Sequence, residues 1–413
     1  MKKALLLIGV GIVLRLWFIH AFPQPFGWDQ YEYHQYARKI LEHGWLASHS
    51  YRSYPYPLFV AVIYRLFGFA NLSAVRLVQV GMDTLTGILV YVAIAAISKK
   101  GKAAWLGFFL YEVNPFTAGY VGVILSEVLS AFLLSATLVA GIFWVHHKWW
   151  FWAFWVGLCA SLVAQTRNAA LLWAAIPIGA TAFLAFRRRQ WVSIGALIIG
   201  SIVPVLYPLY VNWRDYREVT ITTVDSMFAR ELFNGAILTR LPPFTYVYPR
   251  QVQEMYGEYH SEYDPGRTTA GRAAMAAKYI AKARAIIQAD PGAYVGNRFE
   301  KMWYVWQKEN IFFYEEKDFV RHRPYTYVIN LLLLIFAAAG LWLLSRKPST
   351  SPRRWFLIVA VGSIIYATVS FSFTHAEYRL TIPYYPLLIM AAAVGVVWFI
   401  KETGRIIARH KDL

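Results

Sequence analysis

Cysteine, charged residues and metal-binding motifs are scarce in this sequence. Cys159 is the only cysteine among 413 residues, so no disulfide can form within the chain. Charged residues make up 15% of the sequence, whereas a soluble domain carries about 25%. No His-Glu-x-x-His, Cys-x-x-Cys, Asp-x-Asp or glycine-rich phosphate-loop motif occurs. A soluble enzyme and a structural metal site are therefore not expected, while the need for a divalent metal in catalysis is left open.

Long apolar runs are abundant instead. The chain is 58% hydrophobic with a mean hydropathy of +0.40. Each apolar run has about 20 residues, the length that a helix needs to cross the hydrocarbon core. A membrane β-barrel would show short segments of alternating hydrophobicity instead. The sequence predicts an all-α integral membrane protein with about ten transmembrane helices, at residues 4–22, 75–97, 103–120, 121–145, 149–164, 169–186, 191–213, 325–344, 355–373 and 380–400.

The excess of positive charge follows the predicted topology. The net charge is +18, and lysine and arginine cluster in every second connection, from Lys2 and Lys3 to the tail after residue 400. Cytoplasmic loops carry such an excess, so both termini are expected to be cytoplasmic. The charge pattern therefore indicates a multi-pass topology, and no nucleic-acid partner is expected. The small size, the single cysteine and the lack of targeting tracts predict a plasma (inner) membrane of a prokaryote.

Three parts are expected along the chain. Residues 1–213 form an N-terminal membrane domain, and its first outer loop, residues 23–74, is the candidate catalytic loop. Residues 214–324 form a small extracytoplasmic cap, because this segment is polar and nearly balanced in charge. Residues 325–413 form the C-terminal membrane helices and a cytoplasmic tail.

Three shorter helices are expected outside the membrane spans. Apolar residues at helical spacing predict a cap helix over 269–289, which Asp290-Pro291-Gly292 ends, and a second over 293–307. The apolar stretch 58–69 is too short to span and is expected as a juxtamembrane helix on the outer face.

Unusual polar residues gather at the predicted outer ends of the spans. Taken singly, each is explained as an interface anchor or a helix cap. Their concentration on one face favours a functional site there. The residues are Asp29, Glu32, Tyr33, Arg52, Glu127, Arg167, His375, Glu377 and Arg379.

Four segments stand out along the chain: Asp29-Gln30-Tyr31-Glu32-Tyr33, Tyr54-Pro55-Tyr56-Pro57-Leu58, Asn114-Pro115 with Leu125-Ser126-Glu127, and His375-Ala376-Glu377-Tyr378-Arg379. They resemble motifs of the type C glycosyltransferases, the group that includes protein O-mannosyltransferases and the lipid A aminoarabinose transferase. They occur in the same order and on the same side of the membrane as in that family. Two departures are present, since Gln30 stands where a second acid is common and Ser53-Tyr54 stands where Glu-Lys is common.

This resemblance implies a sugar donor linked to a polyprenyl phosphate and transfer with inversion to an acceptor hydroxyl on a lipid, protein or glycan. Asp29 is the expected general base, and packing by Trp28 and Tyr31 is expected to desolvate it and raise its basicity. Arg379, Arg167 and Arg52 are the candidates for binding the donor phosphate, because a guanidinium engages two phosphate oxygens. No cofactor is implied.

The remaining site residues have two interpretations each. Glu127 either serves the acceptor or an arginine, as a second catalytic group, or caps the helix that it begins. Arg167 either binds phosphate or is an interface anchor. Glu32, Tyr33, His375 and Glu377 are expected to position the substrate or the arginines, and a lone histidine at a helix end is otherwise a surface group.

Charges inside the predicted spans point to a further contact and to an alternative function. Arg15 and Asp83 are expected to pair, whereas Glu112 is expected to face the outer cavity below Asn114. A lipid or glycan transporter without transferase chemistry is the alternative. Transporters commonly carry internal repeats and mid-membrane polar groups. The absence of visible repeats and the one-sided polar residues favour the enzyme.

Overall fold

The structure is a computed structural model that describes residues 2–27, 29–45, 52–98, 101–221, 225–237, 269–308, 311, 323–346, 351–374 and 376–411. Helices and connecting segments account for all of these residues, and none of them lies in a β-strand. The predicted all-α class is therefore confirmed.

Eight of the ten predicted spans are long and apolar enough to cross a membrane. The predicted span at 149–164 is the shorter apolar helix α8 (Trp150–Thr166), which has 17 residues. The eight spans contain α1 (Lys2–Ala21), α4 (Leu72–Ser98), α7 (Glu127–His147), α9 (Ala175–Arg187), α10 (Trp191–Tyr216), α15 (Arg323–Arg346), α16 (Ser351–Ser372) and α17 (Tyr385–Lys411); the 3₁₀ turns η2 (Asn168–Ala170) and η3 (Leu172–Ala174) lead into α9, and η5 (Tyr378–Tyr384) leads into α17.

The prediction of one continuous helix over 103–120 is wrong. Helix α5 (Gly101–Glu112) has only 12 residues, and the chain restarts as α6 (Pro115–Ala118) and the 3₁₀ turn η1 (Gly119–Gly122). The Asn114 side chain accepts hydrogen bonds from the amides of Phe116 and Thr117, which makes it an N-cap. The residue before a proline also disfavours helical geometry, so the chain breaks here.

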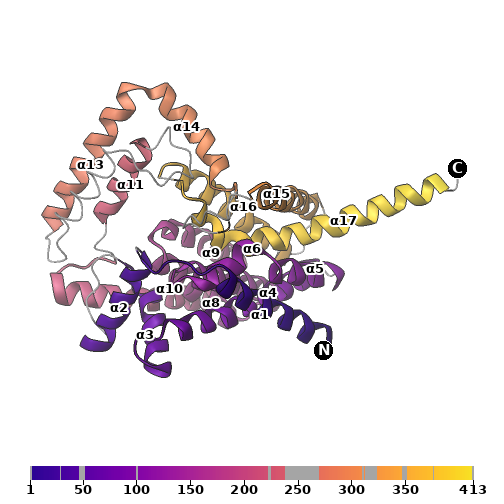
Figure 1. The fold of residues 1–413 in the computed structure, drawn as a ribbon, viewed down its shortest axis with the longest axis horizontal. Helices are drawn as coiled ribbons and strands as arrows, with labels where there is room; N and C mark the ends of the chain where they lie inside the picture. The colour runs from indigo at the N-terminus through magenta and orange to yellow at the C-terminus, as the bar shows by residue number, and fades with distance from the viewer. Residues whose placement is uncertain are drawn as a thin grey trace.

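Close helix contacts at glycines hold the bundle together. A Cβ atom at Gly340 of α15 would lie 1.8 Å from the carbonyl oxygen of Ala391 in α17. A Cβ atom at Gly200 of α10 would lie 2.2 Å from the carbonyl oxygen of Phe154 in α8. Small residues at such crossings let backbones approach in membrane proteins. Helix α17 then continues beyond the bundle toward the C-terminus (Figure 1).

Two short helices follow α1, and both lie within residues 23–74, the predicted catalytic loop. Helix α2 (Asp29–His43) is polar, and α3 (Pro55–Phe67) is apolar and packs on α2 and α4. The predicted short helix at 58–69 is therefore confirmed as α3. Tyr56 and Tyr64 are buried, whereas Leu66 near the end of α3 is exposed.

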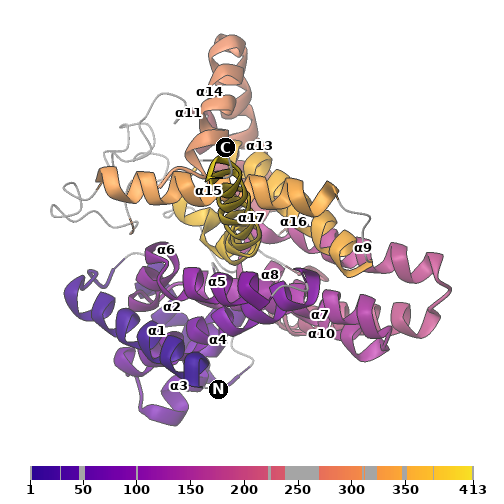
Figure 2. The ribbon, with the colours of Figure 1, turned by 90° about the vertical axis from the view of Figure 1, so that its right-hand side faces the viewer.

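The cap helices project away from the bundle (Figures 1 and 2). They are α11 (Asp225–Ile237), α13 (Thr269–Ala289) and α14 (Pro291–Tyr304), so the predicted helix over 269–289 is confirmed. Phe233, Met275 and Tyr279 form a small core between α11 and α13. Asp290 caps α14, because its side chain accepts a hydrogen bond from the amide of Ala293.

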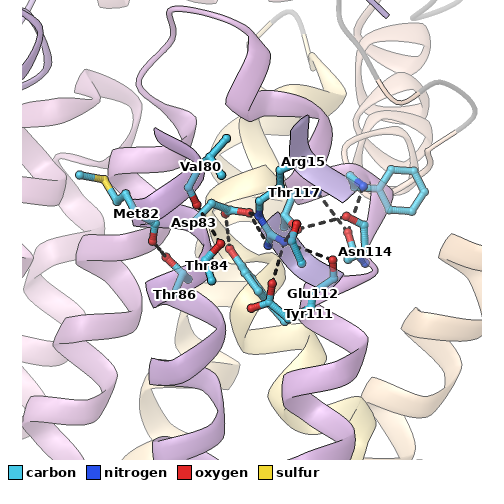
Figure 3. Close-up of polar contacts among 12 residues, drawn as sticks. Arg15, Val80, Met82, Asp83, Thr84, Thr86, Tyr111, Glu112, Asn114 and Thr117 are labelled. Carbon is cyan, nitrogen blue, oxygen red and sulfur yellow. Dashed lines mark hydrogen bonds and ion pairs between the residues drawn. The ribbon is translucent and has the colours of Figure 1, made fainter. Parts of the chain in front are cut away.

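A charged cluster lies buried between α1, α4 and α5 (Figure 3). The Arg15 guanidinium is 2.7 Å from Asp83 and 2.7 Å from Glu112, and all three side chains are buried. The Tyr111 hydroxyl donates to Asp83 over 2.6 Å. The predicted Arg15–Asp83 pair is confirmed. The expectation that Glu112 faces an outer cavity is wrong, because a buried carboxylate needs a counter-charge and Arg15 supplies it.

Candidate active site

The start of α2 is fixed by Gln30. Its side-chain amide donates to the carbonyl of Pro25 over 2.7 Å, and its side-chain oxygen accepts from the amide of Ile124 over 2.9 Å. The side chain is fully buried. An ionised carboxylate at this position could not donate to Pro25, so the amide of Gln30 has a structural reason. The neighbouring Asp29 is thereby held at the helix N-terminus.

Two arginines from distant parts of the chain converge on Asp29. Arg52, before α3, lies 2.5 Å from one carboxylate oxygen, and Arg379, in η5, lies 2.8 Å from the other. The side chains of Asp29 and Arg379 are 23% and 13% exposed, so the pair is largely buried but still partly accessible. The structure therefore brings together three of the predicted site residues.

Further carboxylates extend this contact into a chain of alternating charge. Arg52 contacts Glu32 at 2.6 Å and lies over the ring of Tyr33 at 5.2 Å. Arg379 also forms an ion pair with Glu377. The order is Glu32, Arg52, Asp29, Arg379, Glu377. Each arginine is held by two carboxylates, which restricts its orientation. His375 lies outside the described residues.

The ionisation of Asp29 differs from expectation. Burial by itself raises the pKa of this carboxyl, but the charges of Arg52 and Arg379 lower it more, so the pKa lies well below its usual range. The predicted gain in basicity is therefore wrong in this arrangement. Tyr31 is 52% exposed, and Trp28 lies outside the described residues. Asp29 is ionised and a weak proton acceptor while both guanidinium groups hold it.

A second ion pair lies at the start of α7. Glu127 is the first residue of this helix, and its carboxylate is 2.9 Å from Arg167 at the end of α8. Their side chains are 3% and 10% exposed, which a lipid-facing anchor would not be. The structure therefore favours Glu127 as the partner of an arginine over Glu127 as a helix cap alone, and it argues against Arg167 as an interface anchor.

Short polar contacts connect the two groups of charges. The Ser53 hydroxyl donates to the side-chain oxygen of Asn168 over 2.6 Å, which ties the residue after Arg52 to the residue after Arg167. The Tyr33 hydroxyl lies 3.5 Å from the hydroxyl of Ser126, the residue before Glu127. Sequence reasoning missed Ser53, Asn168 and Gln30 as parts of the site. Their positions next to the predicted charges are the one signal that pointed to them.

The chemistry available at this site is that of anion binding and proton transfer. The two groups of ion pairs together hold three guanidinium groups and four carboxylates, so their summed formal charge is −1. Within the part of the chain that the structure describes, no three His, Cys, Asp or Glu residues could hold a metal ion together. Each of the four carboxylates of this site contacts an arginine instead.

Comparison with solved structures identifies the fold. Two crystal structures of the Archaeoglobus fulgidus oligosaccharyltransferase match with TM-scores of 0.54 and 0.52, at 12% and 13% identity. The matches cover 99% and 97% of this chain but only 52% and 50% of the archaeal one. This chain therefore spans about half the length of those proteins. No protein-family model matches it, and neither does any curated protein sequence.

The fold that this chain shares with these structures is that of an archaeal oligosaccharyltransferase. The second archaeal structure carries an acceptor peptide with the sequence NVT, tethered by a disulfide bond. The likeness extends over nearly the whole chain, so the arrangement of its helices resembles that of the archaeal protein. At this identity, the likeness concerns the fold alone.

Proposed function

We propose that the protein is a membrane glycosyltransferase that moves a sugar from a polyprenyl phosphate to an acceptor hydroxyl on the extracytoplasmic face. The observation that carries the proposal is the contact of Asp29 with Arg379 over 2.8 Å, made by residues from opposite ends of the chain. A carboxylate and a guanidinium at one outer rim are the two groups that such a transfer requires.

The donor phosphate competes with Asp29 for the arginines. Because the site already carries one more carboxylate than guanidinium groups, an anionic phosphate is bound favourably only when it replaces a carboxylate. Asp29 is the carboxylate that two arginines share. A phosphate held by Arg52 and Arg379 displaces Asp29, and Arg167 supplies the third positive charge.

Displacement turns Asp29 into a base. Once the two positive charges face the phosphate, the pKa of Asp29 rises toward its ordinary value, since those charges had lowered it. The acceptor oxygen then attacks the anomeric carbon, and the bond from that carbon to the phosphate oxygen breaks. The lipid phosphate leaves with the bonding electrons, while Asp29 takes the hydroxyl proton. This single displacement inverts the anomeric centre, as in inverting glycosidases.

The other site residues hold the arginines in place. Glu127 orients Arg167, and Glu32 with Tyr33 orients Arg52, as their contacts indicate. Glu377 does the same for Arg379. The proposed steps require no cofactor, because the arginines provide the charge that a leaving phosphate needs. Chelation with EDTA tests this directly.

The setting of the reaction follows from topology. We propose a multi-pass protein of the plasma membrane with both termini in the cytoplasm, with residues 214–324 as an extracytoplasmic cap between the membrane parts 1–213 and 325–413. The peptide bound to the archaeal neighbour makes a protein acceptor the first class to test, ahead of a lipid or a glycan.

The test is a transfer assay with the full chain in lipid nanodiscs. Decaprenyl-phosphate-linked mannose or arabinose is supplied with peptide, lipid or glycan acceptors, and products are detected by mass spectrometry. We expect a product of inverted configuration, by NMR, with at least one acceptor class. A second arm measures movement of the lipid-linked sugar across vesicle membranes. If the lipid-linked sugar crosses the membrane at the same rate in the native protein and in Asp29→Asn, and no sugar transfer is detected, the protein is a transporter and not a transferase.

A further inference from the structure

Three consecutive residues before α3 attach to three different elements. Arg52 binds Asp29 of α2, Ser53 binds Asn168 at the start of η2, and Tyr54 reaches α10. The Tyr54 hydroxyl donates to the backbone carbonyl of Pro204 over 2.6 Å. Tyr54 is 5% exposed, and its ring stacks on Tyr207 with the centroids 4.2 Å apart. A single turn of chain therefore joins parts of the bundle that are far apart in sequence.

The carbonyl that Tyr54 binds lacks its ordinary helical partner. In an α-helix the carbonyl of residue 204 accepts from the amide of residue 208. Residue 208 is a proline inside α10 and has no amide hydrogen. The Tyr54 hydroxyl replaces that missing donor. Since Pro204 is buried, its carbonyl would otherwise lie unsatisfied away from water.

We infer that Tyr54 is a positioning residue for the phosphate-binding arginines. This inference rests on the function proposed above. Tyr54 fixes the backbone of residues 52–54 against α10. This fixes the position of the Arg52 backbone, from which the Arg52 side chain extends to Asp29. Through Ser53 and Asn168 the same anchor constrains the corner that carries Arg167. A misplacement of about 1 Å in a catalytic constellation can cost ~100-fold in rate, so a rigid anchor at this point matters.

The first experiment is a stability cycle that needs no substrate. Unfolding is followed with a thiol-reactive dye, because Cys159 is the one cysteine and is buried in α8. Tyr54→Phe is expected to lower the melting temperature by roughly 1–3 °C, the effect of one lost buried hydrogen bond. Combined with Arg52→Gln, it is expected to lower the temperature by less than the sum of the single effects, because the two residues share one anchor.

Two further variants test the cause. Pro208→Ala restores an amide donor to the Pro204 carbonyl, so Tyr54→Phe should cost less in that background than in the native one. Thr181→Val is the matched control, since it removes a buried hydrogen bond to Trp355 between α9 and α16. Its effect should add to that of Arg52→Gln. Additive effects of Tyr54→Phe and Arg52→Gln would overturn the inference.

The second experiment measures binding of decaprenyl monophosphate. Tyr54→Phe is expected to weaken this binding about 10-fold, whereas Thr181→Val should not change it. Unchanged binding by Tyr54→Phe would make Tyr54 a structural residue alone and would overturn the inference. If the native protein fails to bind the lipid phosphate, the proposed function fails, and the stability cycle still decides whether Tyr54 positions Arg52.

Discussion

Arg379 gives the sharpest quantitative prediction of the proposed donor site. Arg379→Gln removes the guanidinium that lies 2.8 Å from Asp29, while Arg52 keeps its contact with the same carboxylate. A hydrogen bond to a charged group contributes about 1.5–3 kcal/mol. Loss of one such contact to the donor phosphate therefore weakens binding about 10- to 150-fold, at ~1.4 kcal/mol per tenfold.

The assay is thermal unfolding with decaprenyl monophosphate, reported by the reactivity of Cys159. At a lipid concentration 100 times the native dissociation constant, the ligand stabilises the native protein by about 2.7 kcal/mol. A variant that binds 100-fold more weakly gains only about 0.4 kcal/mol at the same concentration. Arg405→Gln is the control, because Arg405 pairs with Glu402 on the exposed end of α17. Equal stabilisation of Arg379→Gln and the native protein would refute the reasoning.

Three further predictions concern the surrounding structure. Glu127→Gln removes the buried, charged partner of Arg167 and should lower the free energy of unfolding by about 3 kcal/mol. It should also weaken binding of the donor. Unchanged stability together with unchanged donor binding would exclude this ion pair from the site. Gly87→Ala places a Cβ atom 2.1 Å from the carboxylate of Glu112 and should cost roughly 1–3 kcal/mol, whereas Gly81→Ala on the same helix meets nothing within 4 Å and should not destabilise. Lys301 is buried in α14, and this burial, together with the charge of the neighbouring Arg298, lowers its pKa to about 6. Between pH 6 and 10 the unfolded chain then binds more protons than the folded one, so the melting temperature should rise as the pH is raised. The rise should be smaller in Lys301→Met. The same dependence of melting temperature on pH in that variant would contradict the lowered pKa of Lys301.

Local patterns predicted the helices well because apolar length and spacing determine them. The helix over 269–289 and the membrane class required nothing beyond residue order. The break after α5 was missed, since Asn114 and Pro115 sit inside an otherwise apolar run. A helix N-cap such as Asn114 acts through hydrogen bonds from its side chain to nearby backbone amides, and mean hydropathy does not detect these bonds.

The sequence indicated which charged residues lie close together better than it indicated their electrostatics. Sequence order placed Asp29 and Arg379 at the same rim, and the structure confirms their contact. The lowered pKa of Asp29 depends on two arginines that reach it from different loops, which a linear sequence does not reveal. The Tyr54 anchor depends on a missing helical donor in a distant element, and coordinates were needed to find it.

Asp29→Asn, measured for donor binding and for sugar transfer in parallel, tests the central claim most directly. Loss of a proton acceptor should reduce transfer about 10²- to 10⁴-fold. Binding of decaprenyl monophosphate should be retained or tightened, because a neutral side chain no longer competes for Arg52 and Arg379. Transfer at the native rate by Asp29→Asn would contradict the account.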